Sequence, residues 1–306
     1  MPMRQLLLPG LLLVALVAAA CQPRGPSDTG AAASDRPAQA VLLLTRHLRD
    51  DDLAAFARAA VPPALHAQLV VAWRNGSRWP LEELPVHQRL PDILATLSRP
   101  GAEAALRGTF EREFAGADAE IRAASTALGQ FGVQYLQGDN RYSTAEREHY
   151  AQLMTAASVW AARAPLSDRT RAARAIARLA RAARATRLRS DADLARAGMT
   201  GSLRQLQPFV TTLKAVLADY GLRLDRDLAA MQATLQVQTG DRAQVRLRYQ
   251  FAGTPIDALV DLERHDGRWY LSDFMRHAEA AVAAAGRAPA ATGNARRPRA
   301  DGGRAG

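Results

Sequence analysis

The most restrictive feature of the sequence is a change of hydrophobic period near residue 231. From there to Phe274 apolar and polar residues alternate, and three turns divide the alternation into four runs, with Leu235, Val237 and Trp269 among the apolar positions. A period of two places successive side chains on opposite faces of a strand, and such turns join antiparallel neighbours. The alternation predicts a four-stranded antiparallel meander with one apolar, buried face. The turns lie at residues 239–241, 253–255 and 266–267.

Most of the chain before residue 220 follows a helical period. Apolar residues recur every three to four positions in stretches separated by Pro, Gly and Asp, a pattern typical of amphipathic helices. Several polar residues stand where a side chain can accept hydrogen bonds from the first free N–H groups of a helix. The expected caps are Asp51 or Asp52, the capping box of Ser143 and Glu146, Ser167 or Asp168, and Ser202.

Two of these helices, over residues 117–137 and 144–163, are joined by a short turn and predict an antiparallel hairpin. Gly129 and Gly132 would let the two helices approach closely. A later helix, over residues 202–220, is expected to cover the apolar face of the sheet. The expected fold class is α+β, with a mainly helical N-terminal part followed by a helix-covered four-stranded antiparallel meander.

The positive charge is concentrated in two segments. The formal net charge is +10, and residues 167–189 hold eight Arg and one Asp, while residues 287–306 hold five Arg and one Asp. Five or more arginines on one side of a helix cannot be buried unpaired, so that side faces water, acidic side chains of the same protein or an anionic partner. An arginine-rich composition alone is weak evidence for nucleic acid, and none is expected. The candidate anion-binding residues are Arg171, Arg174, Arg178, Arg181 and Arg184.

The first 20 residues have the organisation of a signal peptide. A single charge, Arg4, precedes an apolar run that is shorter than the ~20 residues of a membrane-spanning helix and that ends in small residues. Ala18-Ala19-Ala20 then precede Cys21, the only cysteine of the chain. Three small residues before a cysteine resemble the lipobox of bacterial lipoproteins, whose cysteine is acylated and becomes the first residue. The alternative is an ordinary secretory signal cut near Ala20, with Cys21 incidental.

The lipoprotein resemblance implies a lipid anchor and a location. Gln22, rather than aspartate, follows Cys21, which by resemblance to lipoproteins of two-membrane bacteria favours the periplasmic side of the outer membrane. Pro, Gly, Ser and Ala then dominate the sequence, as in flexible tethers. The expected division is a signal peptide over residues 1–20, a tether over 21–37, a helical region over 38–200, an α+β antiparallel-sheet domain over 201–285 and a disordered basic tail over 286–306.

The last hairpin carries a second resemblance. Asp266-Gly267 followed by Arg268-Trp269-Tyr270-Leu271 resembles the final hairpin of NTF2-like or cystatin-like domains, and residues 48–56 are similar to the first helices of such proteins. The resemblance implies a fold and transfers no catalytic residue, because NTF2-like proteins range from enzymes to binding modules.

No motif for a nucleophile, a metal or a nucleotide is present, so no cofactor is expected. Glu146, Glu148 and His149 come nearest to an acid–base cluster, but they diverge around a helix, with Glu146 expected on its exposed side. Asp257 and Asp261 are expected on the solvent face of the sheet. We therefore expect a non-enzymatic binding or structural module of the cell envelope, whose partner is an anionic lipid, an envelope polymer or an envelope protein. The alternative is an NTF2-like small-molecule-binding or hydrolytic enzyme.

Overall fold

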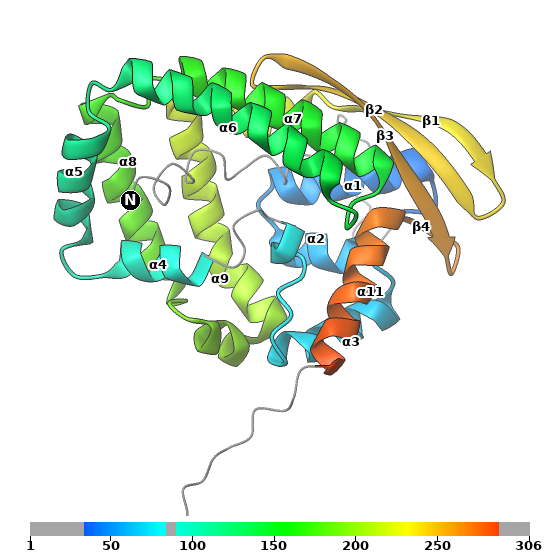
Figure 1. Ribbon diagram of the computed structural model, residues 1–306. Coiled ribbons are helices and arrows are strands. Elements are labelled where there is room, and N and C mark those ends of the chain that lie inside the picture. Colours follow the sequence, from blue (N-terminus) through cyan, green and yellow to red (C-terminus); the bar gives the residue numbers. More distant parts are fainter. Residues whose placement is uncertain (1–33, 84–89, 288–306) are drawn as a thin grey trace, which may run out of the picture.

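The computed structural model describes residues 34–83 and 90–287, so Cys21, the leader and most of the expected tether and tail lie outside the described residues. Within them the chain has the expected α+β class, with helices in the majority and one four-stranded antiparallel sheet. The sheet lies at one end of the molecule, and the helix that carries the candidate arginines lies at the other (Figure 1).

The first described third of the chain is a series of short helices. α1 (Pro37–Arg49) turns into α2 (Leu53–Ala59) at Asp51, which has a positive φ of 58°. The side chain of Asp52 accepts a hydrogen bond from the N–H of Ala55 at 2.8 Å, which confirms it as a helix cap. The next elements are α3 (Pro63–Arg74), the 3-10 turn η4 (Leu81–Glu83), α4 (Leu90–Ser98) and α5 (Ala102–Glu113).

α6 (Asp118–Gly138) and α7 (Thr144–Arg163) form the predicted antiparallel hairpin, packed side by side along one side of the molecule (Figure 1). The absence of a side chain at Gly129 permits this approach, because an added Cβ would lie 2.4 Å from that of Ser158. Gly132 is in a similar position against α7. Both glycines therefore have the role predicted from the sequence.

α8 (Arg169–Thr186) begins where expected, with the carboxylate of Asp168 as its cap. α9 (Asp191–Asp219) is kinked at Gly198, whose φ of 68° is not helical. Ser202 does not cap the second half of α9, contrary to expectation. It is buried, and its hydroxyl donates to the carbonyl of Leu194 at 3.0 Å, because the two halves of α9 remain in contact across the kink.

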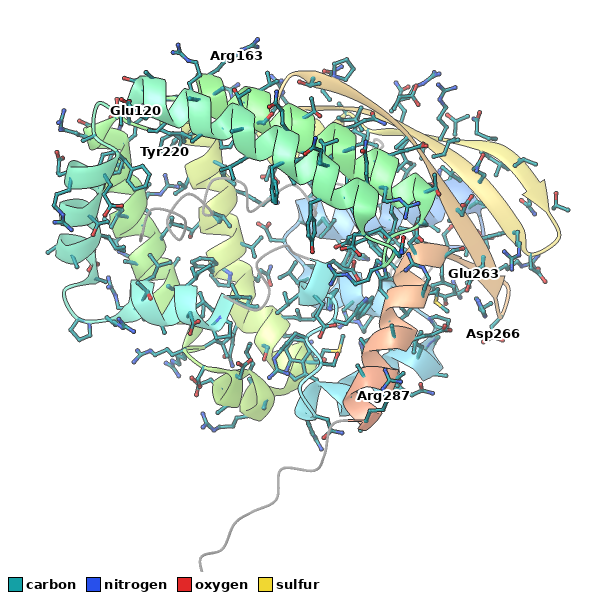
Figure 2. The ribbon with its side chains drawn as sticks, in the orientation of Figure 1. Glu120, Arg163, Tyr220, Glu263, Asp266 and Arg287 are labelled. Atoms are coloured by element: carbon teal, nitrogen blue, oxygen red, sulfur yellow. The ribbon has the colours of Figure 1, made fainter. Side chains whose placement is uncertain are left out.

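The sheet is the predicted meander, with its strands in the order of the sequence. On β2, β3 and β4 the apolar residues of its inner face are buried or half-buried, and Trp269 is 2% exposed, as predicted, whereas Leu235 of β1 on the same face is 42% exposed. Asp257 and Asp261 lie on the exposed outer face, also as predicted, and Glu263 and Asp266 lie near the free end of the last hairpin (Figure 2). The strands are β1 (Gln232–Thr239), β2 (Arg242–Phe251), β3 (Thr254–His265) and β4 (Arg268–Leu271).

β1 departs from the predicted alternation at Val237. Leu235 pairs with Val245 of the inner face, but a bulge follows, and Val237 pairs with Gln244 of the outer face. A bulge inserts one residue into a strand, here Gln236, and so reverses the alternation beyond it. Val237 is 54% exposed, and the prediction that it belongs to the buried face is wrong.

The helix predicted to cover the sheet does not do so. α9 packs on α8, α3 and α2, whereas the sheet contacts α1, α7, α10 (Leu224–Ala229) and α11 (Ser272–Arg287). α11 follows β4 directly, and its residues Met275, Ala278 and Ala281 are buried in the same core cluster as the strands. α9 itself runs through position 200, where the sequence suggests a division between two parts.

Candidate functional site

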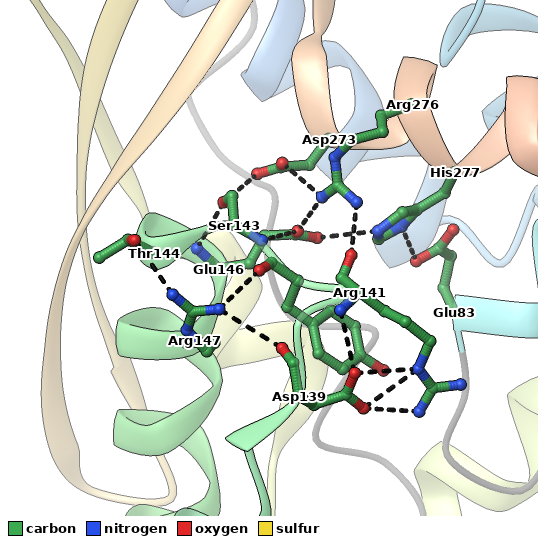
Figure 3. Close-up of polar contacts among 11 residues, drawn as sticks. Glu83, Asp139, Arg141, Ser143, Thr144, Glu146, Arg147, Asp273, Arg276 and His277 are labelled. Atoms are coloured by element: carbon green, nitrogen blue, oxygen red, sulfur yellow. Dashed lines mark hydrogen bonds and ion pairs between the residues drawn. The ribbon is translucent and has the colours of Figure 1, made fainter. Parts of the chain in front are cut away.

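A group of ionisable side chains meets where the start of α7, the first turns of α11 and η4 come together (Figure 3). Glu146 is buried, with 7% of its side chain exposed, and its neighbours Glu83 and His277 are partly buried, at 12% and 16%. Ionised groups in such positions require partners, because burial removes their hydration. Glu83, Glu146, Asp273, Arg276 and His277 are called the Glu146 cluster below, and they are the candidate functional site.

Glu146 is held in place by the predicted capping box. The N–H of Glu146 donates to the Ser143 hydroxyl at 3.1 Å, and the carboxylate of Glu146 accepts from the N–H of Ser143 at 2.9 Å. The expectation that Glu146 lies on the exposed side of its helix is wrong. Arg276 and His277 of α11 lie against its carboxylate and bury it.

His277 lies between two carboxylates. Its Nδ1 is 2.8 Å from Oε2 of Glu83, and its Nε2 is 3.6 Å from Oε1 of Glu146. The guanidinium of Arg276 donates to the other oxygen of Glu146 and, at 2.8 Å, to Asp273. Three carboxylates thus surround two basic side chains, and each contact joins different turns or elements of the fold.

Burial raises the pKa of Glu146 to about 7, with a smaller contribution of the same sign from Asp273 and opposition from His277. Burial alone would lower the pKa of His277, but the hydrogen bond to Glu83 and the charges of Glu83 and Glu146 outweigh it, so this pKa is raised. Glu146 and His277 face each other, and each charge affects the pKa of the other, so the two groups titrate as a pair.

The turn between α6 and α7 forms a wall of the site (Figure 3). The ring of Tyr142 packs edge to face with Tyr150 at 5.4 Å between centroids and with His277 at 6.0 Å, and burial raises the pKa of Tyr142. In the same turn the Arg141 guanidinium donates to Asp139 at 2.6 Å, which lowers the pKa of that carboxyl to about 2. Asp139 therefore stays ionised while the proton of the inner cluster can move.

The geometry suits clamping and proton sharing better than attack on a substrate. Oε1 of Glu146 is buried without a hydrogen-bond partner and faces His277 across 3.6 Å, whereas Glu83, Asp273 and Arg276 are each bonded to another member. Because every other charged group of the cluster is bonded within it, the cluster ties α7, α11 and η4 together.

Nothing matches the chain in comparisons with protein-family models, with curated proteins or with solved structures. Among residues 34–83 and 90–287, no three or more His, Cys, Asp and Glu side chains are grouped so that they could hold a metal ion. In the same part of the chain, every helix is too short or too polar to cross a membrane. Cys21, expected to carry lipid, lies outside these residues.

The arginines predicted to bind anions lie on α8, which packs among α4, α5 and α9. Three of them are engaged within the protein. Arg171 donates to the main-chain carbonyl of Asp219, and Arg178 binds the carboxylate of Asp219 at 2.6 Å. Arg184 pairs with Glu103 of α5, also at 2.6 Å. Intramolecular pairing, one of the three alternatives left open by the sequence, therefore accounts for part of this face.

The other two predicted arginines, Arg174 and Arg181, are exposed. Neither forms an ion pair with a side chain in the described part of the chain. They are seven residues apart and so lie almost on one line along the helix. The part of the arginine face that is free for an anion consists of these two side chains.

His149 and Glu148, which the sequence groups with Glu146, lie elsewhere. Nε2 of His149 is 2.7 Å from the hydroxyl of Tyr249 beneath the sheet, and burial lowers the pKa of His149 to about 4. Glu148 is exposed. Of these three neighbours, Glu146 thus belongs to a buried cluster, His149 forms a hydrogen bond in the core and Glu148 faces the solvent.

Glu83, Asp273, Arg276 and His277 are the members of the cluster that the sequence analysis did not single out. Asp273, Arg276 and His277 follow the spacing i, i+3, i+4, which places them on one face of a helix, and this signal was available. No local pattern links that face to Glu83 or Glu146, because both are more than 100 residues away in the chain.

Proposed function

We propose that the protein is a lipid-anchored lipoprotein on the periplasmic side of the bacterial outer membrane, whose folded body is a non-enzymatic binding or structural module of the envelope. The anchor is supported by the leader and by Ala18-Ala19-Ala20 before Cys21, and the outer membrane by Gln22. The described body begins at Ser34, so only residues 22–33 separate it from the proposed site of acylation.

One observation carries the non-enzymatic part of the proposal: apart from Oε1 of Glu146, which is buried and faces His277, the charged groups of the Glu146 cluster are bonded to one another. A general acid or base must come within hydrogen-bond distance of its substrate. Glu146 is almost fully buried, and its carboxylate lies against Arg276 and His277 of the cluster and the N–H of Ser143. A cluster of this kind stabilises the joint between α7, α11 and η4, as a body that presents surfaces to a partner requires.

We also propose that residues 201–285 are a variant of the NTF2-like or cystatin-like arrangement. The four-stranded meander, its Asp-Gly hairpin and the contact of α10 and α11 with the sheet support this proposal. An NTF2-like enzyme would be favoured by polar side chains converging on the inner face of the sheet. That face is filled mainly by apolar side chains such as Val245, Leu247 and Phe251, which favours a module over an enzyme.

Metabolic labelling with palmitate in a bacterium with two membranes tests the anchor. We expect the wild-type protein to be labelled and to fractionate with the outer membrane, and Cys21→Ala to lose the label. Ser27→Ala, a change in the same segment that leaves the cysteine in place, is the matched control and should keep the label. Label on the Cys21→Ala protein, or none on the wild type, would refute lipid anchoring.

For the partner, we propose an anionic lipid or envelope polymer at Arg174 and Arg181, with an envelope protein as the alternative. At about 1 kcal/mol per arginine, changing both to Gln should weaken binding to anionic vesicles roughly 30-fold at low ionic strength. Arg107→Gln with Arg163→Gln removes the same charge from other exposed sites and is the control. Equal binding by the two double variants would argue against a site on α8.

A further inference from the structure

The sheet has three stretches of strand edge without a neighbouring strand of the sheet, and the described chain covers two of them. At β4, Ser34 forms an antiparallel bridge with Trp269, whose N–H donates to the Ser34 carbonyl at 2.9 Å. The first half of β3 extends beyond β4, and there Gln152 of α7 donates to the carbonyl of Asp257 at 2.8 Å and accepts from its N–H at 3.0 Å. The Gln152 side chain thus binds both main-chain groups of Asp257, as a neighbouring strand would.

The outer edge of β1 is the third stretch, and it is open. β1 pairs with β2 on one side, and no strand of the described residues pairs with its other side, at the margin of the sheet (Figure 1). All of its residues except Ala233 are exposed, with Leu235 at 42%. Open edges are usually protected by charged residues, proline or a cover. The strand, Gln-Ala-Thr-Leu-Gln-Val-Gln-Thr, has no charge and no proline.

We propose that the outer edge of β1 binds the same edge of a second copy, antiparallel about a twofold axis, so that the two sheets become one. An open edge offers main-chain donors and acceptors to another strand. β1 carries no charge, so it offers nothing to attract a charged peptide, and two copies meet without the repulsion of like charges across a strand pair. This inference is independent of lipid anchoring.

The side chains of β1 are complementary to themselves. Glutamine and threonine carry both donors and acceptors, so each can satisfy a copy of itself. The bulge places Leu235 on the inner face and Val237 on the outer face, which gives the joined sheets an apolar contact on both sides. The amide of Gln236 donates to the Thr234 carbonyl at 3.3 Å, a long contact between exposed groups that a neighbouring strand can replace.

The first test measures the mass of the full chain in detergent by sedimentation over a range of concentrations. We expect a dimer of the wild type, and at least a tenfold larger dissociation constant for Val237→Lys. The matched control is Leu259→Lys, because Leu259 is also an exposed apolar residue of the outer face, at 40%, but belongs to the stretch of β3 whose edge is covered by α7. A monomeric wild type, whether its edge is free or covered by residues outside the described part, would overturn the proposal, as would equal effects of the two lysines.

Disulfide formation provides a second test that does not depend on a charged residue. Cys21 is the only cysteine, so a thiol introduced into the full-length Cys21→Ala chain is unique. We expect Thr234→Cys or Gln238→Cys, both in β1, to give a covalent dimer under mild oxidation. Gln250→Cys is exposed at the end of β2 and should remain monomeric. Equal cross-linking from β1 and from Gln250→Cys, or none from β1, would contradict an interface at this edge.

Discussion

Replacing Glu146 with Gln tests whether burial raises the pKa of Glu146 as the geometry of the cluster implies. Its pKa is raised from an ordinary value of 4.5 to about 7, so the folded protein binds this proton more tightly than the unfolded chain does. The stability from this group is therefore fully present below about pH 4.5 and is lost as the pH rises through about 7. At about 1.36 kcal/mol per unit the whole effect is about 3 kcal/mol, of which about 2 kcal/mol falls between about pH 5.5 and about pH 8.

The pH dependence of the wild type alone does not isolate this effect, because three histidines act in the opposite sense. Burial lowers the pKa of His47, His66 and His149, so their contribution to stability increases as the pH rises. His277, whose pKa is raised, acts in the same sense as Glu146. Subtracting the curve of the Glu146→Gln variant removes the contribution of the other histidines and leaves that of the cluster.

Urea unfolding at a series of pH values provides the measurement. The free energy of unfolding of the wild type minus that of Glu146→Gln should decrease by about 2 kcal/mol from about pH 5.5 to about pH 8. The matched control is Glu148→Gln, which removes an exposed glutamate of the same helix outside the cluster and should not reproduce this decrease. A flat or rising difference for Glu146→Gln would mean that Glu146 is not the group that holds the proton.

Three further changes test the core and the packing by urea or thermal unfolding. Trp269→Ala should reduce the free energy of unfolding by roughly 3–5 kcal/mol, and an unchanged melting temperature would place Trp269 outside the core. Gly129→Ala should cost about 1–3 kcal/mol because the new methyl group meets Ser158, whereas Gly138→Ala, with open space around it, should not destabilise by this amount. Lys214→Met leaves one buried carboxylate and two carbonyl groups without their donor and should cost roughly 3–5 kcal/mol; no loss would mean that this buried contact does not stabilise the fold.

The parts of the fold that the sequence predicted are those set by neighbours in the chain. Alternation and turn residues define the strands, and Asp52, Ser143 and Asp168 mark helix starts because a cap acts within one turn. The bulge at Gln236 has no local cause of this kind, since a strand and a bulged strand use the same residues. The sheet packs on α1, α10 and α11 rather than on α9. Which helix covers it depends on how the apolar faces of all helices and of the sheet pack together in the whole fold.

The candidate site follows the same division. The capping box predicted where Glu146 stands and which N–H group its carboxylate accepts from. It did not predict that the carboxylate is buried, because the burial depends on α11, whose cationic face comes from the far end of the chain. A capping glutamate is an ordinary exposed residue until another element covers it. The pKa and the function of such a residue are therefore properties of the tertiary contact.

The arginine helix shows what a charge count can and cannot decide. Outside the two arginine-rich segments and the leader, the chain has slightly more acidic than basic residues, so acids are available to α8. Glu103 and Asp219 bind arginines of α8 because α5 and α9 pack beside it, and the count could not say which arginines they reach. The pairing leaves Arg174 and Arg181, so the proposed binding to an anionic surface would gain about 2 kcal/mol rather than the roughly 5 kcal/mol expected from five free arginines. An affinity for anionic vesicles near the larger value would require the paired arginines to leave their acids, and the protein would then lose stability as it binds.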